Sequence, residues 1–149
     1  SVVCAGPKAI LDIPKTLEVL ETLGVPVITF GQASLPAFWS SDSPFASPLS
    51  LDDPSLIARS HKIRECIGLS GGQLIANPIP KADQIPFEII EPIVIEAVKL
   101  ANEKKIIAKE VTPFILSKIN QLSKGESLLA NIALIKNNAK LASKIALCF

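Results

Sequence analysis

The chain has 149 residues, of which 48% are hydrophobic and 19% charged, and its formal net charge is +1. This composition excludes an intrinsically disordered chain, and the length suffices for one domain with a substantial core. The small net charge gives no reason to expect binding to nucleic acid or to an anionic membrane. No apolar run approaches the ~20 residues of a membrane span.

The distribution of sulfur-containing residues gives two further expectations. The three cysteines, Cys4, Cys66 and Cys148, have neither metal-binding nor disulfide spacing, which favours a reducing compartment. There is no methionine, and the sequence begins within a predicted strand, so we expect a segment of a longer protein.

Lys8 is the first candidate for chemistry. Residues 2–5 form an apolar run that predicts a buried strand, and Gly6-Pro7 ends it. Lys8 therefore lies at the carboxyl end of a strand, where open α/β sheets bind ligands. The apolar residues 9–11 beside it favour a neutral amine, which can form a Schiff base with a carbonyl substrate. A solvated surface lysine is the competing interpretation.

Helices and strands then alternate along the chain. Asp12 and Pro14 predict the start of a helix that Gly24 ends, and residues 25–30 predict a second buried strand. Residues 32–51 form a long connection without regular structure, rich in proline and serine, that also contains Phe38, Trp39 and Phe45. We expect it to pack onto the body of the protein or a partner chain; a substrate lid is the alternative.

The middle of the chain predicts one helix and one strand. Asp53-Pro54 begins the helix, which runs to about Cys66 and contains His61, a lone histidine more typical of a surface or edge residue than of a ligand. The turn Ser70-Gly71-Gly72 leads into a strand over residues 73–76. The turn can present backbone amides to a phosphate, although a plain tight turn is the simpler interpretation.

The remaining sequence predicts helices. A helix over residues 87–104 must either begin or kink at Pro92, and residues 106–109 predict a short extended piece. Thr112-Pro113 predicts the cap of a helix to about Leu122. The last helix covers residues 127–147, with a core stripe at Leu128, Ile132, Ile135, Ala139 and Ala142.

Asparagines give further candidate binding residues. Asn77 follows the strand over residues 73–76, at its ligand-facing end. Asn131 and Asn138 are seven positions apart and share one helix face, where their amides can read a sugar or a uracil-like edge. A polar solvent-exposed face is the alternative. The whole pattern predicts an α/β domain with a largely parallel sheet flanked by helices in α/β/α layers.

Several stretches together resemble one family, the pseudouridine-5'-phosphate glycosidases. They follow the family's order over nearly the whole chain. They include Val3-Cys4-Ala5-Gly6, Lys8-Ala9-Ile10-Leu11-Asp12-Ile13, residues 16–27, Pro36-Ala37-Phe38, Gly71-Gly72, Ala76-Asn77-Pro78-Ile79-Pro80, Lys109-Glu110-Val111-Thr112-Pro113-Phe114 and residues 129–139. By this resemblance, residues 1–149 are a single partial domain, the carboxyl-terminal half of a family member, whose amino-terminal half is absent.

The resemblance implies reversible cleavage of pseudouridine 5'-phosphate to uracil and ribose 5-phosphate, by an enzyme of the lyase or glycosidase type. It implies that Lys8 is the nucleophile that forms a Schiff base with the ring-opened ribose, and that Asn131 lies near the uracil; Asn138 and Asn77 are weaker binding candidates. It also implies Mn²⁺, held by an aspartate upstream of this segment, a cytoplasmic or mitochondrial homotrimer, and in some relatives fusion to a sugar-kinase domain.

Departures from the family pattern keep other functions open. Pro7 and Ser70 stand where the family has small residues, and the family's proton-donating glutamate lies upstream, so we expect this segment alone to be inactive. A degenerate relative with a binding or assembly role is the alternative. A nucleotide-binding, kinase-like module built on Gly71-Gly72 ranks last, because no Walker-type lysine follows these glycines.

Overall fold

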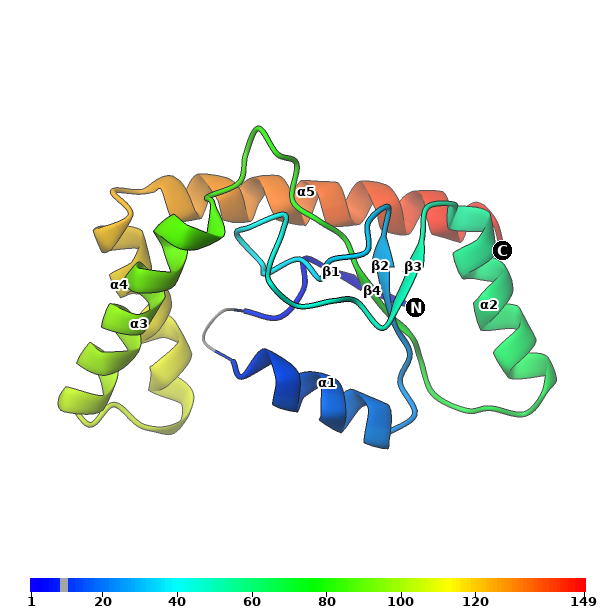
Figure 1. Cartoon of the computed structure of the whole chain (residues 1–149), viewed down its shortest axis with the longest axis horizontal. Coiled ribbons are helices and arrows are strands. Elements are labelled where there is room, and N and C mark those ends of the chain that lie inside the picture. Colours follow the sequence, from blue (N-terminus) through cyan, green and yellow to red (C-terminus); the bar gives the residue numbers. More distant parts are fainter. Residues whose placement is uncertain (9–10) are drawn as a thin grey trace.

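A computed structural model of the chain describes residues 1–8 and 11–149, so Ala9 and Ile10, beside Lys8, lie outside the described residues. The strands are β1 (Val2–Cys4), β2 (Val27–Phe30), β3 (Leu49–Leu51) and β4 (Leu74–Ala76). The helices are α1 (Ile13–Thr22), α2 (Pro54–Cys66), α3 (Phe87–Glu103), the short 3₁₀ helix η1 (Ala108–Glu110), α4 (Val111–Leu122) and α5 (Glu126–Ala146) (Figure 1).

The strands form one sheet in the order β1-β4-β2-β3, and every neighbouring pair is parallel. Cys4 pairs with Ala76, and Thr29 pairs with Ala76 on the other side, so β4 is an interior strand between β1 and β2. The predicted α/β fold with a parallel sheet is confirmed. The strand β3 was not predicted, because its three residues are mostly exposed and only pairing with β2 makes them a strand.

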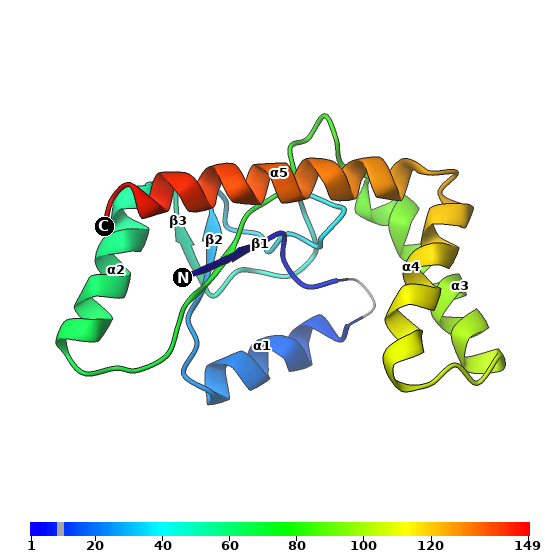
Figure 2. The ribbon, with the colours of Figure 1, turned by 180° about the vertical axis from the view of Figure 1, so that it is seen from behind.

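Side chains alternate between the two faces of the sheet, and each face is covered by helices. Ile28 and Ile75 point to the face covered by α2 and α5, where they pack with Ile57, Leu141 and Ile145. Val27 and Ala76 point to the opposite face, where they pack with Ile13 of α1. Figures 1 and 2 show α5 and α1 on opposite sides of the sheet, which gives the predicted α/β/α layers.

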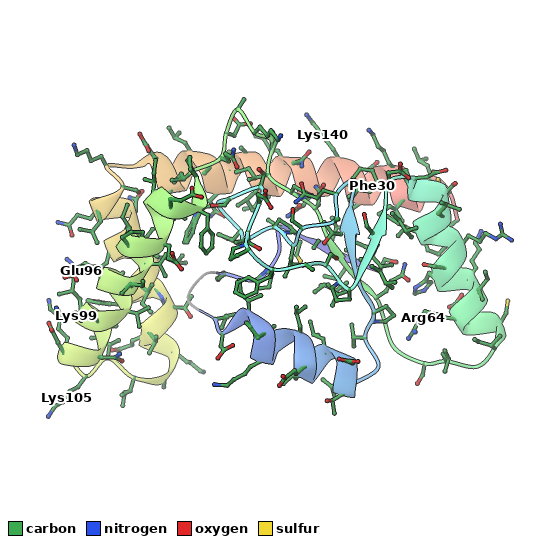
Figure 3. The ribbon with its side chains drawn as sticks, in the orientation of Figure 1. Phe30, Arg64, Glu96, Lys99, Lys105 and Lys140 are labelled. Carbon is green, nitrogen blue, oxygen red and sulfur yellow. The ribbon has the colours of Figure 1, made fainter. Side chains whose placement is uncertain are left out.

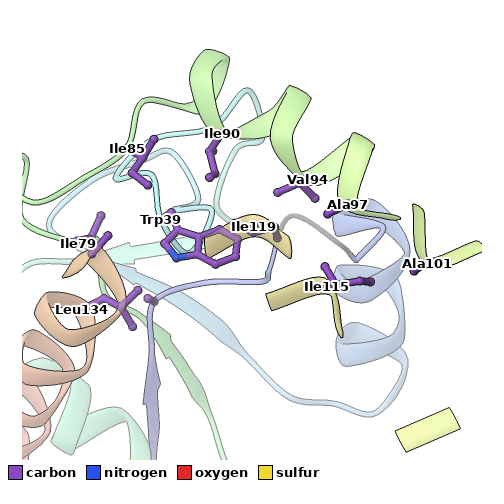
Figure 4. Close-up of a cluster of buried hydrophobic side chains, with 12 residues drawn as sticks. Trp39, Ile79, Ile85, Ile90, Val94, Ala97, Ala101, Ile115, Ile119 and Leu134 are labelled. Carbon is purple, nitrogen blue, oxygen red and sulfur yellow. The ribbon is translucent and has the colours of Figure 1, made fainter. Parts of the chain in front are cut away.

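A second core lies beyond the sheet, where α3 and α4 pack together. Trp39 is 2% exposed at its centre, surrounded by side chains from the loops and from α3, α4 and α5 (Figure 4). Leu35 and Ala37 of the same connection are fully buried. The expectation that residues 32–51 pack onto the body of the protein is therefore confirmed.

Two aspartates begin helices as predicted. Asp12 accepts a hydrogen bond from the backbone N–H of Lys15 at 3.1 Å, and Asp53 accepts one from Ser55 at 2.8 Å. A hydrogen bond from the backbone N–H of Lys15 and, to a smaller extent, one from the Lys15 side chain hold the pKa of the Asp12 carboxyl below its usual value. Each carboxylate satisfies a backbone donor that a helix start leaves without a partner.

The predicted helix over residues 87–104 is confirmed as α3, which begins at Phe87 and continues through Pro92, so it does not start at the proline. Two other predicted boundaries need correction. Residues 108–110 form η1, so the predicted extended piece is wrong. α4 begins at Val111, which leaves Thr112 inside the helix, not at its cap. Residues 108–110 lie between α3 and α4, which pack against each other, and propensity alone did not locate these ends.

The predicted core stripe of α5 is also wrong. Leu128 and Ile135 are 53% and 56% exposed, and Ala139 and Ala142 are exposed as well. The buried face carries Ser127, Ala130, Leu134, Leu141 and Ile145. Both sets have helical spacing, so the periodicity of this leucine- and alanine-rich helix could not identify which face is buried.

Several charged side chains of the helices extend away from the body of the molecule. Figure 3 shows Glu96, Lys99 and Lys105 extending away from the body at the α3 end, and Lys140 extending away from α5. Within residues 1–8 and 11–149, none of the helices combines the length and apolar character that crossing a membrane requires.

The central position of β4 gives a first prediction. Ile75 is fully buried, so Ile75→Ala should lower the free energy of unfolding by about 2–5 kcal/mol through lost burial and a new cavity. Ile95→Ala, at a position 61% exposed on α3, is the matched control and should change it by less than ~0.5 kcal/mol. Urea unfolding followed by circular dichroism measures both. Equal losses would contradict this assignment of the core.

Candidate functional site

The candidate site lies where β1 and β4 end side by side. The ladder continues for one residue beyond the strands, because the backbone N–H of Asn77 donates to the carbonyl of Cys4 at 2.7 Å. The segment that leads to Lys8 and the segment that begins at Asn77 therefore leave the sheet at the same edge. This is the edge at which parallel α/β sheets bind ligands.

Gly6 allows the chain to turn towards Lys8. Its φ is +86°, and a Cβ atom built on it would lie 1.9 Å from the carbonyl oxygen of Pro36. Only glycine tolerates both conditions, so the backbones of the β1 exit and of the connection pack directly together. Next to this contact, the N–H of Phe38 donates to the carbonyl of Ala5 at 2.9 Å.

The predicted position of Lys8, on the turn after a strand, is confirmed. The expectation that this strand is buried is wrong, because β1 lies at the edge of the sheet: Val2 is 61% exposed, and Val3 and Cys4 are half-buried. Its side chain is half-buried, and its Nζ atom lies over the ring of Phe38, 5.8 Å from the ring centroid. In the part of the chain that the structure describes, no carboxylate lies within ion-pair distance of this nitrogen. A solvated surface lysine stays the competing interpretation.

Cys4 is the other nucleophilic side chain near this edge. It faces a small cavity that residues of α1 and the sheet also line. Burial raises the pKa of its thiol, and a hydrogen bond with the backbone of Gly6 opposes this only in part. Because the thiolate is the nucleophilic form, burial favours Lys8 over Cys4 as the reactive group of this edge.

Two of the predicted asparagines bind each other. Asn77 is 4% exposed, and its Nδ2 donates to Oδ1 of Asn138 at 3.1 Å. The neighbouring Asn137 donates to the carbonyl of Pro78 at 2.9 Å. These bonds attach α5 to the exit of β4, and they give Asn77 and Asn138 a structural role. Their proposed contact with substrate stays a prediction.

Asn131 lies two turns before Asn138 on α5. It is half-buried, and within the described ranges its amide forms no hydrogen bond. Its neighbour Ala130 packs in the same cluster as Ala5, which directly precedes the turn to Lys8. The Asn131 amide therefore flanks the cluster that holds the β1 exit, and its polar atoms retain their capacity to bind a ligand.

A separate hollow of about 740 Å³ lies between the serine-rich connection and residues 81–88. Its lining includes neither Lys8 nor the asparagines. Ser40 donates to the carbonyl of Ile85 at 2.6 Å, and Ser41 donates to Oε1 of Gln84 at 2.6 Å. The serines therefore attach the connection to the body, and they do not form part of the Lys8 site.

The turn at Gly71-Gly72 lies at the other end of the sheet. It precedes β4, whereas Lys8 follows the parallel strand β1, so the turn and the lysine are at opposite edges. Parallel sheets bind nucleotides at the carboxyl ends of their strands. The tight-turn interpretation fits this position, and the kinase-like interpretation does not.

His61 lies on α2, near Glu65 and Phe149. The Nε2 atom of His61 lies 4.0 Å from Oε1 of Glu65, and the His61 ring packs edge-on against Phe149. Over the described residues, no group of three or more histidine, cysteine, aspartate or glutamate side chains could hold a metal ion. The described side chains therefore do not form a manganese site on their own.

Sequence reasoning missed the aromatic side of the site. The aromatic side chains in the connection over residues 32–51 indicated that it packs onto the body of the protein. No signal in the sequence placed the ring of Phe38 against Lys8, which lies 30 positions away. The short stretch Pro36-Ala37-Phe38 belongs to the family resemblance, and this was the one available indication of its importance.

The fold and this edge define an α/β protein with a lysine at the carboxyl end of a parallel strand. The family model described as indigoidine synthase A like protein matches residues 1–148, so the chain belongs to this family. It is 59% identical over 146 residues to a pseudouridine-5'-phosphate glycosidase of Paracoccus denitrificans, covering 98% of this chain and 48% of that protein. A protein of the same name from Roseobacter denitrificans is 58% identical, with 98% and 47% covered. The predicted resemblance is confirmed.

Two solved structures have the same fold. An indigoidine synthase A-like protein from Thermotoga maritima has a TM-score of 0.86 and 33% identity, over 97% of this chain and 47% of that one. The prealnumycin C-glycosynthase AlnA, solved in complex with ribulose 5-phosphate, has a TM-score of 0.86 and 27% identity over the same shares. The chain spans about half the length of the curated relatives it matches.

The contact at Gly6 gives a second prediction. Gly6→Ala should lower the free energy of unfolding by about 2 kcal/mol or more, because alanine disfavours positive φ and its Cβ would overlap Pro36. Gly72→Ala is the matched control, since it has no such φ and no atom within 4 Å of the added Cβ. Thermal unfolding of both variants measures the difference. A Gly6→Ala variant as stable as Gly72→Ala would disprove the close contact.

The asparagine pair gives a third prediction. Asn138→Ala should cost about 1–3 kcal/mol, because it leaves the buried amide of Asn77 without its partner. A double-mutant cycle with Asn77→Ala should show a coupling energy of at least ~0.5 kcal/mol. Asn102→Ala, on the exposed surface of α3, is the control and should be neutral or slightly stabilising. Additive effects of the two variants would show that the bond does not attach α5.

Proposed function

We propose that the chain carries the nucleophile of a pseudouridine-5'-phosphate glycosidase, and that this nucleophile is Lys8. The observation that carries the proposal is the position of Lys8, half-buried at the carboxyl end of β1, in a chain that is 59% identical to a protein of that name. The ribulose 5-phosphate bound to AlnA supports a sugar phosphate as the ligand class.

The chemistry of the substrate explains the need for an amine. The bond to be broken joins two carbons, so protonation of an oxygen or nitrogen leaving group, as in ordinary glycoside hydrolysis, is unavailable. Opening of the ribose ring makes C1 available, and the Lys8 amine joins it through a C–N bond. When the C–C bond breaks, its electron pair stays with C5 of uracil, which takes a proton, and the nitrogen lone pair completes an iminium between Lys8 and C1 of the sugar.

The chemistry of its amide supports a role for Asn131 in binding uracil. An amide offers both donors and an acceptor, which match the alternating N–H and C=O groups of a uracil edge. Asn131 is half-buried, and the helix that bears it is attached to the β4 exit through Asn138 and Asn137. We assign Asn131 to uracil binding, and we assign Asn77 and Asn138 to holding α5 in place.

The family resemblance adds parts that this segment does not supply. It implies a proton-donating glutamate and an aspartate that holds Mn²⁺, both upstream of Lys8. The chain spans about half the length of its relatives, so we expect residues 1–149 alone to have no turnover. The binding or assembly role remains the second candidate for this segment in isolation.

Reductive trapping gives the fourth prediction. The protein, in the full length that its gene encodes, is incubated with ribose 5-phosphate and borohydride. It should gain one reduced sugar phosphate on the peptide that contains Lys8. Lys8→Arg should lower trapping by at least about 100-fold, because a guanidinium does not form the imine. Lys15→Arg, at a side chain 80% exposed beside Asp12, is the control and should trap normally. Peptide mass spectrometry locates the label, and a label at another lysine would refute the assignment.

A further inference from the structure

Phe38 is held in an unusual backbone conformation at the Lys8 site. Its φ is +59°, in the left-handed region that residues with a side chain seldom adopt. It lies in a tight turn in which Ala37 and Ser40 exchange backbone hydrogen bonds of 3.0 and 3.3 Å. Strained residues of this kind occur preferentially at functional sites. At this site, the strained backbone of Phe38 determines where its ring lies.

Four contacts fix the position of that ring. The N–H of Phe38 donates to the carbonyl of Ala5, and Pro36 packs against Gly6, so the turn is attached to the β1 exit. The rings of Phe38 and Trp39 meet edge to face, with centroids 4.8 Å apart and planes at 89°. The Nε1 atom of Trp39 donates to the carbonyl of Ser127 at 3.1 Å, which connects the turn to α5.

The face of the Phe38 ring is directed at the Lys8 amine. The distance of 5.8 Å from Nζ to the centroid lies within the range in which an aromatic face attracts a cation. The electron-rich face acts on a positive charge and is indifferent to a neutral group of the same size. In the described part of the chain, carboxylates are not within ion-pair distance of Nζ, so the ring is the electrostatic partner that this segment provides.

We propose that Phe38 is a positioning residue for Lys8, and that its ring stabilises the cationic iminium formed on that lysine; this rests on the function proposed above. The Lys8 nitrogen forms a bond to the carbonyl carbon of the open-chain sugar phosphate. The carbonyl oxygen leaves as water with one proton from the amine and one from solution: one amine, one aldehyde and one proton give one iminium cation, which keeps one N–H, and one water. The C=N group of the iminium carries a positive charge, whereas the amine and the aldehyde are neutral. The Phe38 ring faces this charge.

Fluorination of the ring tests this without changing its shape. Phenylalanine, 4-fluoro-, 3,5-difluoro- and 3,4,5-trifluorophenylalanine are placed at position 38 of the naturally encoded protein, and the rate of borohydride trapping of ribose 5-phosphate at Lys8 is measured. Each fluorine withdraws electron density from the face, so the rate should fall stepwise, by about two- to fivefold over the series. A purely structural role would leave the rate unchanged.

Phe114 provides a matched control. The Nζ atom of Lys104 lies over its ring at 5.7 Å, so the same series at position 114 alters an equivalent contact away from Lys8 and should not change trapping. A flat series at position 38, with the adduct still on Lys8, would overturn the role of Phe38 and leave the proposed function standing. An unsubstituted protein that gives no adduct on Lys8 would overturn the proposed function itself.

The ring contact has a second readout that needs no sugar. Protons over an aromatic face resonate upfield, so the ε-protons of Lys8 should lie upfield of those of other lysines and move downfield in Phe38→Leu. The corresponding protons of Lys104 should be unaffected by that substitution. A Lys8 resonance that does not move would show that ring and amine are apart in solution, and would overturn the inference.

Discussion

The structure depends on the contact between the β1 exit and the turn at residues 36–40. The carbonyl of Pro36 occupies the space that a Cβ of Gly6 would need, and Phe38 donates a hydrogen bond to Ala5. A backbone approach this close leaves the lysine segment little freedom, because both chains are fixed at the same point. The position of Lys8 follows from this contact more than from its own turn.

The same turn connects the sheet to the helical end of the molecule. Trp39 fills the core between α3, α4 and α5 and donates a hydrogen bond to Ser127 at the start of α5. Near the middle of this helix, Asn137 and Asn138 bond the residues that leave β4. These attachments fix the rotation of α5 about its axis, and therefore determine that Asn131 flanks the core beside β1.

Family membership and the geometry of the Lys8 site both support a reaction that uses a lysine amine. The comparisons identify the family and its fold, and relatives twice as long carry the glycosidase name. The geometry adds a half-buried amine at the carboxyl edge of a parallel sheet, under an aromatic face and away from the hollow of the serine-rich connection. The pairing of an amine with a π face suits a reaction that creates positive charge on nitrogen.

Local signals in the sequence were sufficient for most of the architecture. The apolar runs, Asp12 and Asp53 as caps, and the glycines after helices predicted the alternating elements, and Gly6-Pro7 correctly placed Lys8 after β1. These features act between residues a few positions apart, so they can be read along the chain. Tertiary structure alone decided which apolar face of α5 is buried, that residues 49–51 form a strand, and that Phe38 meets Lys8. Each of these depends on hydrogen bonds or packing between segments distant in sequence, and periodicity carries no information about such partners.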